Sequence, residues 1–232
     1  MNEEEGKAPL EISLEKPSLF GMFLEPRKQF ERLKDNPIIL VPFIIIAVLT
    51  TIGMFVMMSQ IDFIAQDPEL ANMGEDELMF VTIFTQVIFV ITGILAPAVS
   101  ILVSSFVYFI VAKIAKSEVS FKQLFSMNTF IYIISILGIF VNALAFFAVD
   151  NPNPDVYLTS LNSMVEADGA LGVLFTSIEI FSIWNIILTA IGLQIVARFS
   201  KGLSWELVIG IFVLLTGFSM ATAGVAEMIG AM

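Results

Sequence analysis

Residues 78–111, LMFVTIFTQVIFVITGILAPAVSILVSSFVYFIV, contain no charged side chain over 34 consecutive positions. A transmembrane helix needs about 20 apolar residues to cross the hydrocarbon core of a bilayer, so this run exceeds one upright span. Gly93 and Pro97 interrupt its middle and favour a kink. The run therefore predicts either one long, tilted and kinked membrane helix or two short half-spans that turn at this point.

The rest of the chain repeats this apolar character. Of its 232 residues, 57% are hydrophobic and 14% are charged, with a mean hydropathy of +0.91. A soluble domain has roughly 45–50% apolar and about 25% charged residues. We therefore predict an all-α integral membrane protein, with one membrane domain at 37–232. The predicted spans are residues 38–58, 78–112, 128–149, 178–199 and 207–230.

The cations are confined to alternate segments between these spans. The chain has 11 Lys and Arg residues: Lys7, Lys16, Arg27, Lys28, Arg32 and Lys34 before the first span, Lys113, Lys116 and Lys122 after the second, and Arg198 and Lys201 after the fourth. Because Lys and Arg accumulate on the cytoplasmic side, this pattern predicts five transmembrane helices, a cytoplasmic N-terminus and an extracytoplasmic C-terminus. Splitting residues 78–111 into two spans would place three lysines outside, so one long kinked helix is favoured.

The remaining two loops and the C-terminal tail carry no cation. The loops hold only acidic charges: Asp62, Asp67, Glu69, Glu75, Asp76, Glu77, Asp150, Asp155, Glu166 and Asp168. Their field could attract cationic peptides, or cations are absent there only because they would oppose correct insertion. The net charge of −11 provides no basic footprint, so a nucleic-acid partner is not expected.

The chain has no histidine and no cysteine. Zinc sites of Cys and His, haem held by His, Ser-His-Asp triads and thiol nucleophiles are therefore excluded. We predict no enzyme activity, no catalytic residue, no cofactor and no metal.

The acidic residues 1–17 are expected to be disordered. Because no basic and then apolar leader opens the chain, the first span is expected to act as its own insertion signal.

Residues 18–36 are predicted to form a cytoplasmic amphipathic segment. Phe30 and Leu33 share a helical face, and the neighbouring cations Arg27, Lys28, Arg32 and Lys34 could reach anionic lipid headgroups. The favoured interpretation is an anchor that sets the angle at which the first span enters the bilayer. The alternative is a docking surface for a partner.

Three segments resemble bacterial members of the YIP (Ypt-interacting protein) family. They are FLEPRKQF at 23–30 with Asn36-Pro37 and Val41-Pro42, VSFKQLF at 119–125, and EIFSIWN at 179–185 with Gly192-Leu193 and RFSK at 198–201. The resemblance implies five membrane helices. Eukaryotic members bind small GTPases and shape transport vesicles, a role that does not transfer to a bacterium.

Some bacterial members of this family resemble an accessory membrane protein that acts with an ABC-type exporter and protects against a secreted peptide toxin. The resemblance therefore implies a non-enzymatic accessory or scaffold protein of the bacterial plasma membrane, with an exporter as its membrane partner. A scaffold without an exporter is a further alternative.

Polar and small residues form a stripe on each of three predicted spans. The stripes are Gln86, Gly93, Pro97, Ser100, Ser104 and Tyr108; Asn128, Tyr132, Ser135 and Asn142; and Ser182, Asn185, Thr189 and Gly192. Lipid would penalise these faces, so we expect them to face one another and to form interhelical hydrogen bonds worth about 0.6 kcal/mol each. The alternative is a hydrated path, as in a small-solute transporter or channel.

Glu179 is the one candidate charge inside a span. It either lies about 12 Å inside a helix that begins at Leu171, or caps a helix that begins at Ile180 while residues 169–177 lie on the outer surface. The cap is favoured. Further candidate partner or bundle contacts are Phe30, Pro37, Gln86, Pro97, Asn142, Trp184 and Asn185.

The last span carries Gly210, Gly217 and Gly224 at intervals of seven. Small residues at this spacing let another helix approach closely. Packing inside the bundle is expected, and a homo-oligomer or exporter contact is the alternative.

Overall fold

The computed structural model describes residues 15–59, 70–148 and 156–230. Within these ranges every regular element is a helix, and α3, α5, α6 and α10 are long and apolar enough to cross a membrane. The helices are α1 (Gly21–Leu24), α2 (Pro26–Asp35), α3 (Leu40–Met58), η1 (Leu70–Asn72), α5 (Glu75–Ile114), α6 (Phe121–Phe146), α7 (Asn162–Val165), α8 (Gly169–Ser177), α9 (Ile180–Val196) and α10 (Lys201–Gly230). The all-helical membrane fold is confirmed. Helix α9, at 17 residues, is apolar but shorter than the other four.

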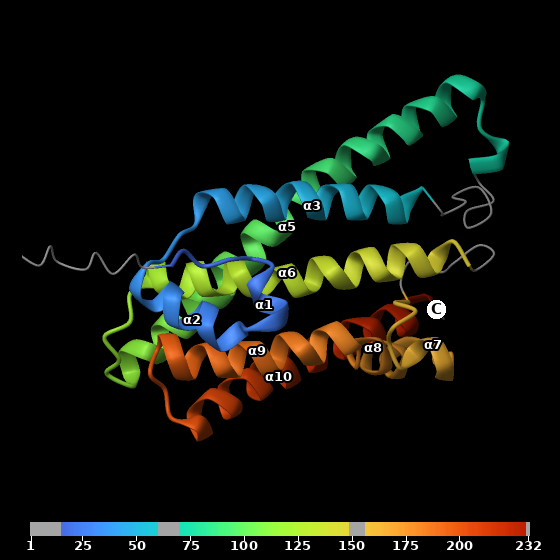
Figure 1. The fold of residues 1–232 in the computed structure, drawn as a ribbon. Helices are drawn as coiled ribbons and strands as arrows, with labels where there is room; N and C mark the ends of the chain where they lie inside the picture. The colour runs from blue at the N-terminus through green and yellow to red at the C-terminus, as the bar shows by residue number, and fades with distance from the viewer. Residues whose placement is uncertain (1–14, 60–69, 149–155, 231–232) are drawn as a thin grey trace, which may run out of the picture.

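Helix α5 decides the question raised by the long apolar run. It is continuous over 40 residues with Pro97 inside it, so the two half-spans are wrong. Its buried residues begin at Gly93, and its N-terminal half leaves the bundle at an angle (Figure 1). A membrane helix can contain proline, and Pro97 therefore does not divide α5 into two helices.

Two helices begin earlier than hydropathy predicts. Helix α6 starts at Phe121 rather than at residue 128, because the Ser120 Oγ accepts from the Gln123 N–H and the Gln123 Oε1 accepts from the Ser120 N–H. Helix α10 starts at Lys201 rather than at 207, with the Leu203 N–H donating to the Ser200 Oγ at 3.2 Å. Such capping lies in polar sequence, which a search for apolar runs passes over.

The other helix bounds lie close to the predicted spans. Helix α3 begins two residues after the predicted residue 38, and α6 ends at Phe146 rather than at 149. Helix α9 spans Ile180–Val196 within the predicted 178–199, because Ala197 ends the helix and Arg198 is left-handed. Most of the predicted disordered segment 1–17 and the loop acids at 62, 67, 69, 150 and 155 lie outside the residues that the structure describes.

Helix α6 is the centre of the bundle. It packs against α3, α5 and α9, while α10 lies against α9 and α8 (Figure 1). The central position explains why α6 carries the longest set of buried residues among the described helices. Helices α3 and α5 lie close together at Gly93, where an added Cβ would lie 2.8 Å from the Thr51 Cα.

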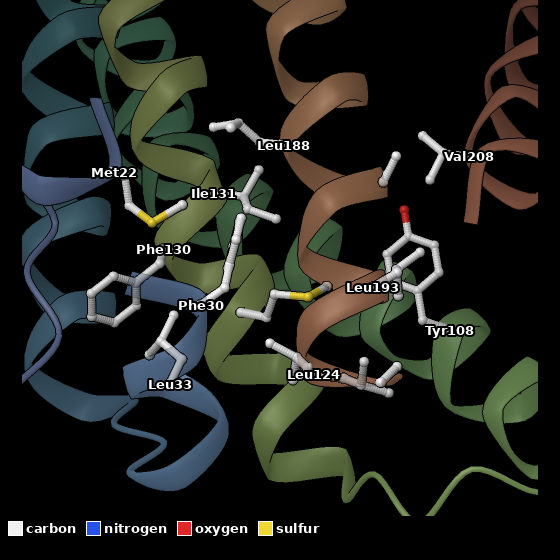
Figure 2. Close-up of a cluster of buried hydrophobic side chains, with 14 of the residues drawn as sticks. Met22, Phe30, Leu33, Tyr108, Leu124, Phe130, Ile131, Leu188, Leu193 and Val208 are labelled. Carbon is white, nitrogen blue, oxygen red and sulfur yellow. The ribbon is translucent and has the colours of Figure 1, made fainter. Parts of the chain in front are cut away.

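The amphipathic segment packs into the bundle instead of presenting its apolar face to lipid. Met22, Phe30 and Leu33 are fully buried against α6 and α9 (Figure 2). Phe30 lies so close to α9 that a Cβ added at Gly192 would be 3.1 Å from its ring. Phe30 is therefore a contact inside the bundle, and it is not available to a partner.

The α5–α6 link, the α9–α10 link and the end of α2 lie at one end of the bundle. The Gln123 Nε2 of α6 donates to the Lys34 carbonyl of α2, and the Ser117 Oγ of the α5–α6 link donates to the Ala197 carbonyl at the end of α9, both at 2.6 Å. Helices α7 and α8, the first turn of α5 and the described end of α10 lie at the opposite end (Figure 1). The α5–α6 and α9–α10 links carry cations, and the opposite end exposes Glu75, Asp76, Glu77, Glu166 and Asp168.

Candidate functional site

Glu179 is the N-cap of α9, as predicted. Its backbone is extended (φ −124°, ψ 143°), and its Oε2 accepts from the Ser182 N–H at 2.7 Å. The preceding helix α8 ends at Ser177, and the backbone of Glu179 pairs with Ser160 in an isolated β-bridge. Glu179 as a whole residue is only 6% exposed, so it is both a cap and a buried acid at one end of the bundle.

Thr159 connects this cap to α6. Its hydroxyl donates to the Glu179 Oε1 at 2.7 Å and accepts from the Asn142 Nδ2 at 2.9 Å. The Asn142 Oδ1 accepts from the Thr159 N–H at 3.1 Å, and the Asn142 Nδ2 also donates to the Gly138 carbonyl. The three side chains form a fully hydrogen-bonded chain, which we call the Glu179 cluster: Asn142, Thr159 and Glu179. Thr159 was missed in the sequence because nothing in its local pattern distinguishes it from other loop residues.

A second link lies further along the same two helices. The Asn185 Nδ2 donates to the Ser135 Oγ at 3.1 Å and to the Phe181 carbonyl at 2.9 Å. The polar stripes of α6 and α9 therefore do face each other. Trp184, one position earlier and about 100° around α9, packs edge-on against Phe23 with ring centroids 6.0 Å apart.

The stripe of α5 meets α6 through a different serine from those expected. The Asn128 Nδ2 donates to the Ser105 Oγ at 2.8 Å, whereas Ser104 donates to the Ser100 carbonyl of its own helix. The buried face of α5 runs through Gly93, Pro97, Ile101, Ser105, Tyr108 and Ala112. Its spacing of three and four residues could have identified Ser105, which polarity alone does not separate from Ser104.

A cavity of about 190 Å³ lies between α6, α9 and the segment that follows α6. Its lining includes Tyr132, Ser135, Asn142, Tyr157, Glu179 and Asn185. Partial burial, and then the nearby Glu179 carboxylate, raise the pKa of Tyr157 above its ordinary value. The polar groups mostly bond to one another, so the arrangement suits interhelical attachment better than passage of a solute.

Gln86 forms no interhelical hydrogen bond among the described residues, and the three glycines of α10 face open space. Gln86 is exposed on the half of α5 that leaves the bundle, and no hydrogen bond of its amide occurs within the described residues. An added Cβ at Gly210, Gly217 or Gly224 would meet no atom within 4 Å. The expected packing of this glycine face inside the bundle is therefore wrong, because the contacts of α10 with α8 and α9 use other positions. Pro37 lies in the short link between α2 and α3 and is half-buried.

The comparisons with known proteins agree with the helical membrane architecture. The family model of the Yip1 domain matches residues 20–223. The chain is 29% identical over 219 residues to the membrane protein YknW of Bacillus subtilis (strain 168), and the match covers 94% of each chain. No solved structure matches. With several apolar helices and a family match over most of its length, this multi-pass membrane protein belongs to the Yip1 domain family.

Proposed function

We propose that this chain is a non-enzymatic accessory protein of the bacterial plasma membrane, which assists an ABC-type exporter in resistance to toxins or antimicrobial peptides. Its similarity to the membrane protein YknW and the resemblance of its motifs to bacterial family members support this role. An accessory protein of this kind needs a surface inside the bilayer that recognises another membrane protein.

The observation that carries the proposal is Gln86 on the projecting half of α5. Gln86 lies eleven residues into the helix, about 17 Å from its start, with its amide exposed and unpartnered among the described residues. A polar side chain in hydrocarbon is costly unless another helix supplies a hydrogen bond, which is worth about 0.6 kcal/mol on average and up to about 1.7 kcal/mol. Gln86 thus fits a contact with a transmembrane helix of the exporter.

The proposed topology has five spans, α3, α5, α6, α9 and α10, with the N-terminus in the cytoplasm and the C-terminus outside. Helix α9 is about 26 Å long, and α6 and α10 flank it. The meeting of the cation-bearing links at one end of the bundle supports this orientation. With the cations inside, the projecting end of α5 points to the outer surface.

Substitution of Gln86 by leucine tests the exporter contact. We expect Gln86→Leu to insert and fold normally but to co-purify several-fold less exporter in mild detergent, because the interhelical hydrogen bond is lost. Thr82→Val is the matched control on the same half-helix, since the Thr82 hydroxyl already donates to the Leu78 carbonyl at 2.8 Å. Equal recovery of exporter with both variants would rule out this contact.

The alternative of a small-solute transporter makes a different prediction. A transporter would move solute across liposomes that contain only this chain, whereas an accessory protein would not. Solute flux by the isolated chain, abolished by substitutions at Asn142 and Asn185, would replace the accessory role with transport.

A further inference from the structure

A large open cavity lies at the cationic end of the bundle. It has a volume of about 740 Å³ and is formed by the end of α2, the α5–α6 link and the α9–α10 link. Three cations, Lys34, Lys116 and Arg198, line it together with one carboxylate, that of Glu118. None of the three cations has an ion pair among the described residues, where the ion pairs join Lys28 and Arg32 to Glu15 and Glu25.

Hydrogen bonds hold the three walls of this cavity in place. The Gln123 side chain binds the Lys34 carbonyl and joins the end of α2 to α6. The Ser117 hydroxyl binds the Ala197 carbonyl and joins the α5–α6 link to the end of α9. Both bonds are 2.6 Å long, so the cations are brought together before any ligand binds.

Two of the cations occupy backbone positions that favour glycine. Lys116 follows the end of α5 with φ 56°, and Arg198 follows the end of α9 with φ 57°. Glycine is the common residue at such helix ends, because a side chain in the left-handed region is strained. The chain instead places a long cationic side chain at both positions, and both line the same cavity.

Part of the lining is apolar: Val119, Val196 and Phe199 are buried behind it, and Leu203 is half-buried. The cavity lies beside the ends of the apolar helices α5 and α9 and the starts of α6 and α10. A lipid phosphate lies at this level of a membrane, with its glycerol and acyl chains toward the hydrocarbon. Inorganic phosphate or pyrophosphate would gain nothing from the nearby hydrocarbon.

We propose that this cavity binds the phosphate headgroup of an anionic phospholipid. Lys34, Lys116 and Arg198 would contact the phosphate oxygens, and the glycerol and acyl chains would extend toward the hydrocarbon between the membrane helices. The inference does not rest on the exporter, because it requires only the folded chain in a membrane.

Lipid binding to the purified full chain tests the proposal. In mild detergent we expect phosphatidylglycerol to bind more tightly than phosphatidylcholine, with native mass spectrometry or a labelled lipid as the readout. The variant Lys34→Gln/Lys116→Gln/Arg198→Gln should lose roughly tenfold to hundredfold in affinity for phosphatidylglycerol. The control Lys113→Gln/Lys122→Gln/Lys201→Gln removes the same charge from residues outside the lining and should keep the original affinity.

A second variant separates lipid binding from a structural role of the cations. Lys116→Gly/Arg198→Gly relieves the strained backbone, so we expect the lipid-free protein to keep or raise its thermal unfolding midpoint while phosphatidylglycerol no longer stabilises it. Undiminished lipid stabilisation of this variant would overturn the proposal, as would equal loss of affinity in the Lys113 control. Displacement of phosphatidylglycerol by an equal concentration of inorganic pyrophosphate would also overturn it, in favour of a soluble phosphate ligand.

Discussion

At the scale of single residues, the Glu179 cluster joins an acid at the start of α9 to an amide near the end of α6. Each Glu179 oxygen accepts one strong hydrogen bond, from Thr159 or from the Ser182 N–H. The Thr159 hydroxyl is the critical group, since it is the donor to Glu179 and an acceptor for Asn142. Loss of that hydroxyl would leave a buried carboxylate oxygen and a buried amide hydrogen without this partner.

Thr159→Val should therefore destabilise the folded protein by about 1–3 kcal/mol, the cost of unsatisfied buried polar groups. Thr159→Ser keeps the hydroxyl and should restore most of the loss. The measurement is the thermal unfolding midpoint in detergent, followed by size-exclusion chromatography. A Val variant as stable as the Ser variant would show that the cluster contributes nothing to the fold.

Glu179→Gln should be milder than Thr159→Val. A glutamine oxygen can still accept from the Ser182 N–H, and its amide can turn toward the Thr159 oxygen. We expect normal membrane insertion and a loss of stability of about 1 kcal/mol or less. Absence of this variant from the membrane fraction would contradict the prediction and show that the negative charge itself is required.

At the scale of elements, glycines distinguish helix faces inside the bundle from faces open to the membrane. A Cβ at Gly192 on α9 would lie 2.8 Å from the Met127 Sδ and 3.1 Å from the Phe30 ring, whereas Gly217 on α10 has open space. The same residue type in two apolar helices thus has opposite surroundings. The first allows α2 to lie against α9. The second lies on a face of α10, formed by Gly210, Gly217 and Gly224 and called the strip on α10, that has no large side chain at these positions.

A matched pair of substitutions follows from this contrast. Gly192→Leu should lower the unfolding midpoint by the equivalent of about 1–3 kcal/mol or more, because the side chain would push α2 and Met127 away from α9. Gly217→Leu should leave the isolated protein as stable as before or more stable, because leucine favours the helix by about 0.8 kcal/mol.

Crosslinking of the Gly217→Leu variant in membranes then identifies what covers the strip on α10. Loss of a crosslink to a second copy or to the exporter, with the fold intact, would assign Gly217 to that interface. Destabilisation of the isolated protein would contradict the open space found around this glycine.

At the scale of the whole molecule, charge is segregated along the bundle. The links after α5 and α9 carry cations, and the opposite end exposes acids near the start of α5 and at 166 and 168. Because segments rich in Lys and Arg stay on the cytoplasmic side during insertion, this segregation favours one orientation in the membrane. It also places the phosphate-binding cavity and the projecting half of α5 on opposite sides of the membrane in the proposed topology.

The absence of cysteine in the chain permits a direct test of that topology. Single cysteines introduced as Glu118→Cys and Asp168→Cys both lie at exposed positions. We expect a membrane-impermeant maleimide to label Asp168→Cys in intact cells and Glu118→Cys only after lysis. The reverse pattern would invert the orientation, and labelling of both from outside would exclude an odd number of crossings between them.

Some of these features follow from the sequence alone. The membrane class, the approximate positions of the long apolar helices and the cap at Glu179 were predicted because partition into lipid and the capping of a helix depend on residues close together in the chain. The resemblance to the YIP family was confirmed for the same reason, since its motifs are short and contiguous. The starts of α6 and α10 were missed because their caps lie in polar sequence at Ser120 and Ser200.

Only the tertiary structure decided which apolar faces meet. In a membrane both the buried and the lipid-facing sides of a helix are apolar, so hydropathy does not separate them. It could not show that Ser105 rather than Ser104 meets Asn128, or that Phe30 lies inside the bundle. Nor could it join Thr159 to Glu179, or bring Lys34, Lys116 and Arg198 around one cavity. These contacts join segments far apart in the chain, and only packing brings them together.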